Sequence, residues 1–185
     1  LGMIVYFGRV CRFKPLSWLV KIYISIMRGT PLMLQLLIWY FGPFYLWGMN
    51  IGGYKFTAII LGCSLNYAAY FAEIYRSGIE SIPTGQYEAA QLLGYTRVQT
   101  FFKIVLPQVV KIVLPSVTNE VITLVKDTSL VYSVSYIEMF AVAKQIAAAQ
   151  TTVVPFFIAG VFYYVFNYVV AWVMELFEKK LNYYR

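Results

Sequence analysis

Long apolar stretches separated by short polar segments dominate this 185-residue chain. Residues 29–54 carry no charge, and a helix of that length would cover about 39 Å, enough to cross a hydrocarbon core of about 30 Å. Aromatic side chains crowd its second half, as they do at a membrane surface. Residues 56–72 and 153–174 are two further uncharged stretches. The pattern predicts membrane-spanning helices, with an outer turn at residues 48–53.

Four other segments have weaker patterns. Residues 1–10 are apolar but interrupted by an arginine, and we interpret them as the end of a longer first helix. Residues 12–28 mix basic and apolar side chains, which is typical of a helix at the inner membrane surface or of the start of a span. Residues 108–130 contain a proline and several charges, so periodicity alone identifies no span there. Residues 130–152 favour short helical pieces.

Composition narrows the class of protein. Hydrophobic residues make up 61% of the chain and charged residues 12%, which indicates a polytopic membrane protein. We expect one domain over residues 1–185. The chain has no histidine, no phosphate-binding loop and no nucleophile–base arrangement, so we expect no catalytic residue and no ATP hydrolysis. Cys11 and Cys63 lie in apolar surroundings and predict neither a disulfide nor a metal site.

Residues 86–107 are polar and lie between apolar stretches, and they have the signals of two short helices with a hinge. We expect Gly85 to cap the first helix, which would put Glu88 in its first turn at the positive end of the dipole. Gly94 would end this helix in the left-handed conformation. Such a hook is typical of a docking element rather than of a catalytic one.

The second helix of this hook has its own signals. Thr96 and Gln99 predict a capping box at its start. An apolar stripe is predicted along it, formed by Val98, Phe101, Phe102 and Val105. Pro107 would mark its end or a kink.

Seven residues of the hook follow the pattern of a known loop, namely Glu88, Ala89, Ala90, Gly94, Ile104, Leu106 and Pro107. They resemble the EAA loop of ABC importer permeases, a coupling helix pair that inserts into a groove on the ATPase subunit. Residues 28–35, 69–79 and 126–130 are similar to the polar amino acid uptake branch of that family. Four such stretches in family order identify the chain as a member more strongly than any one of them does.

The resemblance implies an all-α fold with about five spanning helices, similar to a type I ABC importer permease, with a cytoplasmic coupling loop at about residues 78–107. It implies two ABC ATPase subunits that carry ATP and Mg²⁺, while this chain binds no cofactor or metal. A second permease subunit, identical or closely related, and an extracytoplasmic substrate-binding protein would complete the importer. The substrate would be a polar amino acid, and the location the prokaryotic cytoplasmic (inner) membrane.

The net charge of +7 then becomes a topology signal rather than a sign of nucleic-acid binding. With the EAA-type loop in the cytoplasm, all of the 15 basic residues except Lys55, Lys126 and Lys144 lie on or near the inner side. Residues 86–107 and 181–185 are therefore predicted inside, and residues 48–53 outside.

Charged groups within a bilayer cost about 2.5–3.5 kcal/mol each, so they usually face a cavity or a partner. Glu120, Lys126 and Asp127 meet this description. Lys126 could instead pair with a neighbouring acid, or the helix could end there with its charges at the surface. Because residues 126–130 resemble a family signature near the path, Asp127, Thr128 and Ser129 are candidates to hydrogen-bond the ammonium and carboxylate of the substrate.

Four polar residues within or just after residues 56–72 have candidate roles. Asn66 and Tyr67 are further candidates for the substrate path. We interpret Glu73 and Arg76 as an interfacial salt bridge rather than as substrate contacts.

Two other classes of function remain as alternatives. A self-sufficient secondary transporter or channel would show internal repeats or more ionisable residues at the membrane midplane, and no repeat is visible. A membrane-embedded enzyme is disfavoured because histidine and paired catalytic carboxylates are absent. Co-purification of a protein with a Walker motif would separate the three.

Overall fold

The computed structural model describes residues 1–50 and 52–181, and this part of the chain is helical throughout, with turns between helices. The helices are, in order, α1 (Gly2–Val10), α2 (Lys14–Gly29), α3 (Leu32–Trp47), α4 (Lys55–Glu80), α5 (Thr84–Leu92), α6 (Arg97–Thr100), the π-helical η1 (Phe101–Val105), α7 (Leu106–Asp127), the 3-10 helical η2 (Thr128–Val134), α8 (Met139–Gln150) and α9 (Val154–Leu181).

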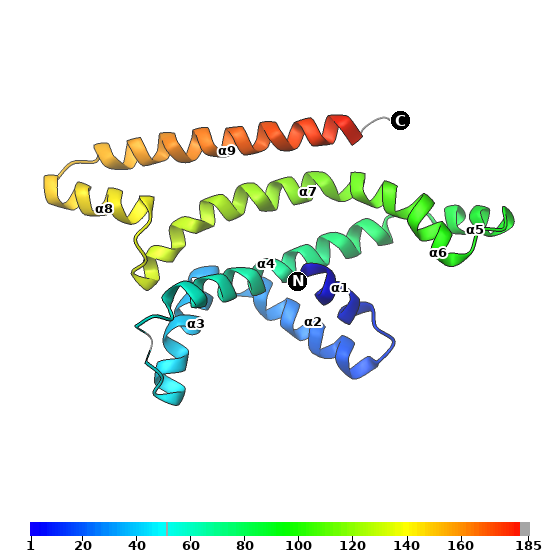
Figure 1. Cartoon of the computed structure of the whole chain (residues 1–185), viewed down its shortest axis with the longest axis horizontal. Coiled ribbons are helices and arrows are strands. Elements are labelled where there is room, and N and C mark those ends of the chain that lie inside the picture. The colour runs from blue at the N-terminus through cyan, green and yellow to red at the C-terminus, as the bar shows by residue number, and fades with distance from the viewer. Residues whose placement is uncertain (51, 182–185) are drawn as a thin grey trace.

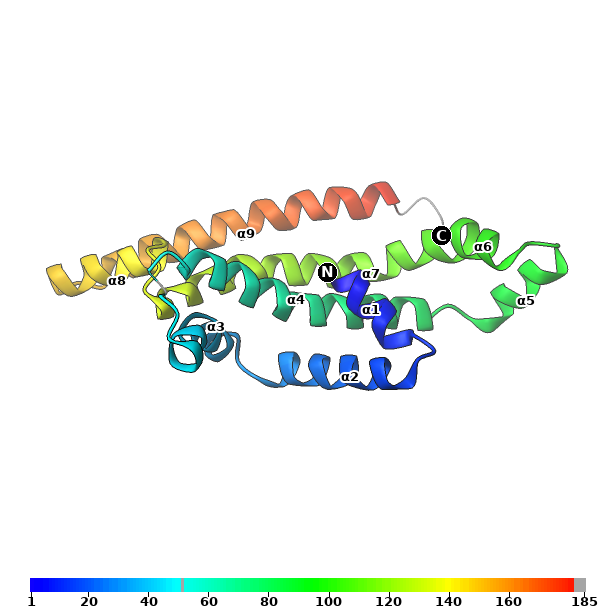
Figure 2. The ribbon, with the colours of Figure 1, turned by 60° about the horizontal axis from the view of Figure 1, so that its bottom comes forward.

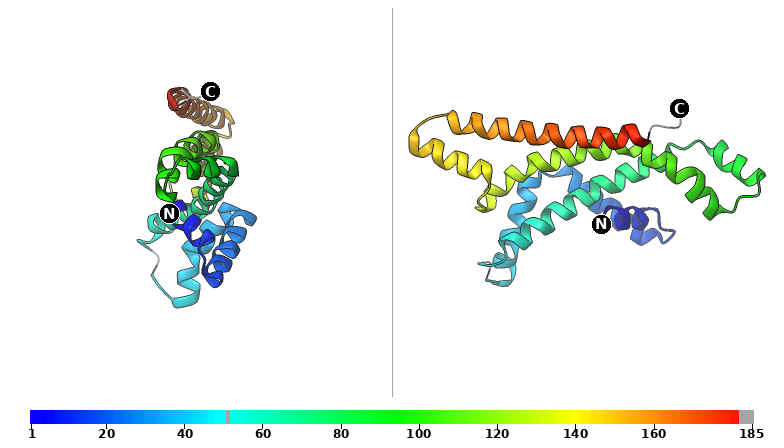
Figure 3. Two further views of the ribbon diagram at one scale, coloured as in Figure 1. Left: turned by 90° about the vertical axis from the view of Figure 1, so that its right-hand side faces the viewer. Right: turned by 45° about the horizontal axis from the view of Figure 1, so that its top comes forward.

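Helices α4 and α7 lie side by side along the long axis of the molecule (Figure 1). Helix α9 packs on the outer side of α7, and α1, α2 and α3 pack on α4, so an end-on view shows three layers (Figure 3). The hairpin of α5 and α6 projects from one end, whereas α8 and the turn after α3 lie at the other (Figure 2). The pair α4–α7 therefore connects the two ends.

Three helical stretches are long and apolar enough to cross a membrane, namely Lys55–Glu80, Arg97–Val134 and Val154–Lys180. The pair α2 and α3 makes a fourth if it counts as one broken span. Helix α1 has nine residues. An all-α, membrane-spanning architecture is thus confirmed, including the span that the resemblance implied over residues 108–130. Helix α7 passes through Pro115 without ending.

The helix predicted over residues 29–54 is shorter than expected, because α3 covers only the 16 residues Leu32–Trp47 and counts as a span only together with α2. The chain bends by 110° between α2 and α3. Pro31 lacks a backbone N–H and disfavours the helical conformation of the residue before it, and Thr30 is extended, at φ −122° and ψ 147°. The bend lies where the mixed basic and apolar segment 12–28 meets the uncharged stretch, and hydropathy alone does not give the angle between them.

Two buried side-chain amides donate hydrogen bonds to the backbone carbonyl groups at this break. The side chain of Gln35 donates to the carbonyl oxygens of Met27 at 3.0 Å and Thr30 at 3.2 Å. The side chain of Asn66 donates to the same Met27 oxygen at 3.1 Å and to Gln35 Oε1 at 3.0 Å. Free carbonyl groups inside a membrane cost several kcal/mol each, so these bonds stabilise the broken pair and join it to α4.

Helix α4 forms the centre of the packing. Its small residues Gly62, Ala68, Ala69 and Ala72 are buried, which permits close contact between helices. One apolar cluster joins α3, α4 and η2, another joins the ends of α4 and α7, and a third joins α2 to α4. Cys11 and Cys63 are both free thiols.

The predicted sides of the membrane can be tested by cysteine labelling. The turn at 48–53 and the α5–α6 hairpin lie at opposite ends (Figure 1); residues 51 and 182–185 of the predicted segments are outside the described residues. In a variant lacking Cys11 and Cys63, we expect a cysteine at exposed Met49 to react with an impermeant reagent in sealed cells, and one at exposed Gln91 to react only after lysis. External labelling at position 91 would contradict this topology.

Candidate functional site

The α5–α6 hairpin starts differently from the prediction. Helix α5 begins at Thr84, directly after Pro83, whose backbone is extended at ψ 137°. Gly85 is therefore inside the helix and does not cap it, and Glu88 is the fifth helical residue, beyond the first turn. Both expectations were wrong because the fixed φ of proline starts the helix earlier than a glycine signal indicates.

The predicted hinge of the hairpin at Gly94 is confirmed. Gly94 has a positive φ of 79°. Its N–H donates to Gln91 O at 3.0 Å and the next N–H, that of Tyr95, donates to Ala90 O at 3.0 Å, which is a Schellman motif. Thr96 and Gln99 then form the predicted reciprocal capping box.

The predicted apolar stripe does not form one face. Val98 and Phe102 are 66% and 61% exposed, whereas Val105 is fully buried. The π-helical η1 adds a residue to the turn, so the 3.6-residue period is lost after Thr100. Pro107 does not end the helix; it lies in the first turn of α7, where a missing N–H is tolerated.

The seven residues that resemble the EAA loop fall into three groups in the structure. Glu88 and Ala89 are exposed on α5, whereas Ala90 is 1% exposed and faces inside the hairpin. Gly94 makes the turn. The remaining three lie at the junction with α7, Ile104 and Leu106 half-buried and Pro107 exposed. The exposed apolar tip beside them includes Leu92 and Leu93, and such a patch outside the membrane is suited to a protein partner.

Three of the path candidates come together between α4 and α7. The hydroxyl of Tyr67 donates to Asp127 Oδ2 at 2.8 Å. Glu120 lies two turns before Asp127 on the same face of α7, and the charges of Asp127 and Arg28 act on its carboxyl. The Tyr67 hydroxyl thus holds the carboxylate of Asp127. The carboxyl of Glu120 lies close enough to Asp127 for their charges to interact.

The other path candidates have different surroundings. The side chain of Asn66 donates hydrogen bonds to Met27 O and Gln35 Oε1 at the break between α2 and α3. The hydroxyls of Thr128 and Ser129 donate to the carbonyls of Val125 and Lys126 on their own helix, at 2.6 and 2.8 Å. Lys126 is exposed, and no ion pair with a neighbouring acid is found for it among residues 1–50 and 52–181. Gln35 was not predicted, although an amide inside a long uncharged stretch was a usable signal.

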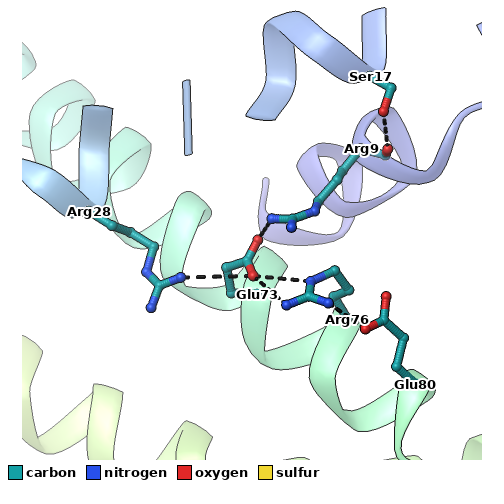
Figure 4. A network of polar contacts seen from close by, with 6 residues as sticks. All are labelled: Arg9, Ser17, Arg28, Glu73, Arg76 and Glu80. Atoms are coloured by element: carbon teal, nitrogen blue, oxygen red, sulfur yellow. Dashed lines mark hydrogen bonds and ion pairs between the residues drawn. The ribbon is translucent and has the colours of Figure 1, made fainter. Parts of the chain in front are cut away.

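Glu73 is the centre of an ion cluster that ties α1 and α2 to α4 (Figure 4). The predicted pair with Arg76 is confirmed at 3.0 Å. Arg9 also contacts this carboxylate, and Arg28 lies 3.8 Å from it. Arg76 in turn pairs with Glu80, one turn further along α4. The approach of Arg9 and Arg28 depends on tertiary packing and had no signal in the sequence. Within the described ranges, no cluster of three or more His, Cys, Asp or Glu side chains could hold a metal ion.

Comparisons with known proteins match nearly the whole chain. The family described as "Binding-protein-dependent transport system inner membrane component" matches residues 1–183. The arginine transport system permease protein ArtQ of Bacillus subtilis (strain 168) is 38% identical over 183 residues, covering 98% of this chain and 83% of ArtQ. The L-cystine transport system permease protein TcyB of the same strain is 34% identical over 187 residues, covering 100% of this chain and 78% of TcyB.

Solved structures are similar as well. The crystal structure of an amino acid ABC transporter with histidines superposes with a TM-score of 0.86 at 32% identity, covering 97% of this chain and 83% of that chain. The MetNI methionine ABC transporter, in an inward-facing conformation, gives a TM-score of 0.75 at 20% identity, covering 98% and 84%, which supports the fold alone.

Proposed function

Because the chain belongs to the family of binding-protein-dependent transport system inner membrane components, we propose that it is the permease subunit of an ATP-driven importer of polar amino acids. As a member of this family it is a membrane-spanning transport subunit and not an enzyme. ATP and Mg²⁺ would be bound by two separate ATPase subunits. An extracytoplasmic binding protein would deliver the substrate across a prokaryotic cytoplasmic membrane.

One observation carries the substrate class. Over 96% or more of its length the chain is similar to permeases named for arginine, L-cystine and octopine transport, all amino acids or their derivatives. The solved amino acid ABC transporter has the same fold at 32% identity. The pair Tyr67–Asp127 fits this class, because a carboxylate at membrane depth can bind an ammonium group.

The hairpin supports coupling to an ATPase. It projects beyond the spanning helices at the end where α4 stops and α7 starts (Figure 2). A movement of α5 and α6 would therefore act directly on α4 and α7, which carry Tyr67 and Asp127. Closure of two ATPase subunits would pull two such hairpins together, and a second permease subunit would complete the path.

Reconstitution tests this proposal. We expect vesicles that contain the chain, its ATPase, internal ATP and an external binding protein to accumulate L-arginine, L-glutamine or L-cystine. Accumulation should stop when the ATPase is omitted. Uptake that is equally fast without the ATPase would favour the secondary-transporter alternative instead.

Asp127→Asn is expected to weaken uptake by about ten- to a hundredfold in KM, since hydrogen bonds to charged groups contribute about 1.5–3 kcal/mol. Basal ATPase activity and assembly should persist. The control Glu178→Gln changes an exposed carboxylate of α9, and we expect normal uptake from it. Unchanged KM in Asp127→Asn would leave Asp127 as a structural partner of Tyr67.

A further inference from the structure

Helix α7 carries a polar face that nothing in the chain covers. Ser116, Asn119, Thr123 and Lys126 are all exposed and recur every three or four residues, so they share one side of the helix. By contrast, α9 exposes mainly Phe, Val and Tyr side chains, as a lipid-facing helix does. Polar side chains at membrane depth face water or protein rather than lipid, so this face of α7 is turned toward an aqueous route or a second subunit.

The end of this face nearest the hairpin opens into a pocket of about 320 Å³. Its lining comes from α2, α4 and α7 and comprises Arg28, Glu73, Ile74, Arg76, Ser77, Gly78, Ile112, Val113 and Ser116. Ser116 belongs to both features, so the pocket is continuous with the polar face. Its volume is at the lower end of the range for small-molecule sites, which suits a ligand of amino acid size.

The charges around this pocket favour an anion. Two arginines, Arg28 and Arg76, and one carboxylate, Glu73, line the pocket, so its lining carries one positive charge in excess. Figure 4 shows Arg28 and Arg76 on opposite sides of the Glu73 carboxylate, with Arg9 approaching from above.

Arg28 lies furthest from Glu73 of the three arginines that surround it. It is 46% exposed, lies 3.8 Å from Glu73, and its guanidinium carbon is 5.5 Å from the centre of the Tyr70 ring. The ring holds the guanidinium at the edge of the pocket without using its hydrogen-bond donors.

Two hydroxyls add uncommitted donors. No hydrogen bond is found for the side chains of Ser77 and Ser116 among the described residues, and both residues are exposed. A guanidinium and two hydroxyls that line the same pocket supply hydrogen-bond donors that a carboxylate accepts.

We propose that this pocket is an inner-side binding site for the α-carboxylate of the transported amino acid, with Arg28, Ser77 and Ser116 as its donors. The inference rests on the proposed function, to which it adds a second station on the path. An amino acid that leaves the region of Asp127 would follow the polar face of α7 and stop here before release. Because the pocket has excess positive charge, it recognises the carboxylate rather than a cationic side chain.

Equilibrium binding to the assembled permease–ATPase complex tests the site. The complex is kept free of nucleotide and binding protein in phosphatidylcholine nanodiscs. The probe is whichever of L-arginine, L-glutamine and L-cystine the vesicles accumulate, in radiolabelled form, beside its α-carboxamide. We expect the amino acid to bind and Arg28→Gln to weaken binding about tenfold. We expect Ser116→Ala to weaken binding of the amino acid about threefold, and we expect the carboxamide not to bind.

Arg12→Gln is the matched control, since Arg12 is an exposed arginine before α2 and lies outside the pocket. It should bind the probe as the unaltered chain does. If Arg28→Gln does not assemble, Ser116→Ala and Arg28→Lys carry the test, because neither removes the positive charge. We expect Arg28→Lys to weaken binding less than tenfold.

Three results would overturn the proposal: equal binding by Arg28→Gln and the unaltered complex, equal binding of the carboxamide, or displacement of the amino acid when phosphatidylglycerol is added. The last result would assign the pocket to a lipid phosphate. Each of them leaves ATP-dependent uptake by the unaltered chain intact. A failure of the site is therefore distinguishable from a failure of the proposed function, in which no amino acid accumulates at all.

Discussion

Gly78→Leu is expected to prevent stable packing of α4 against α7. A Cβ atom at residue 78 would lie 2.3 Å from Cγ1 of Val113 and 3.3 Å from Cγ1 of Val109. Valine has one strongly preferred rotamer in a helix, so Val113 cannot turn away at little cost. Overpacking costs about 1–3 kcal/mol, more than the ~1 kcal/mol of helix propensity that replacing glycine returns. We expect a lower thermal midpoint of the purified protein and little assembled complex.

Two further variants make this prediction specific. Gly42→Ala adds a Cβ within α3 where nothing lies within 4 Å, and we expect an unchanged or higher midpoint. Adding Val113→Ala to Gly78→Leu should restore part of the loss, because the two side chains compete for one space. A normal midpoint for Gly78→Leu would show that α4 and α7 do not pack closely at residue 78.

Ala89→Phe and Gly94→Val are expected to abolish transport without preventing membrane insertion. Ala89 is exposed on α5, so a phenyl ring there would obstruct a groove on the ATPase while leaving the hairpin intact. Gly94 has no atom within 4 Å of an added Cβ, so the cost of Gly94→Val comes from its positive φ and amounts to about 1 kcal/mol or more. The expected result is loss of ATPase in a pull-down, or retained ATPase with at least tenfold less uptake.

Controls separate docking from folding of the hairpin. Gly94→Asn should behave almost normally, because asparagine tolerates the left-handed conformation. Ala90→Phe is also expected to abolish transport, but for another reason, since Ala90 is buried and a larger side chain would open the hairpin itself. If Ala89→Phe and Gly94→Val both kept normal pull-down and normal uptake, the α5–α6 hairpin would not be the coupling element.

Features that depend on neighbours within a turn or two could be predicted from the sequence. Gly94 adopts the expected left-handed turn and Thr96 and Gln99 the expected capping box, because both depend on hydrogen bonds between residues three to five positions apart. Glu73 and Arg76 pair for the same reason. The spans within 56–72 and 153–174 followed from hydrophobicity over a length that only a membrane requires.

Tertiary structure alone decided which groups meet across the chain. Tyr67 and Asp127 are 60 positions apart, and Arg9 and Arg28 reach Glu73 from two other helices. In a membrane protein, apolar side chains cover both the core and the lipid-facing surface, so hydrophobicity does not reveal which face of a helix is buried. The break at Pro31 has a local cause in the sequence, but the donation from Asn66 on another helix to the Met27 carbonyl, beside that from Gln35, depends on packing. Composition determined that the chain crosses a membrane and Pro31 determined where it bends, whereas packing determined which charges meet.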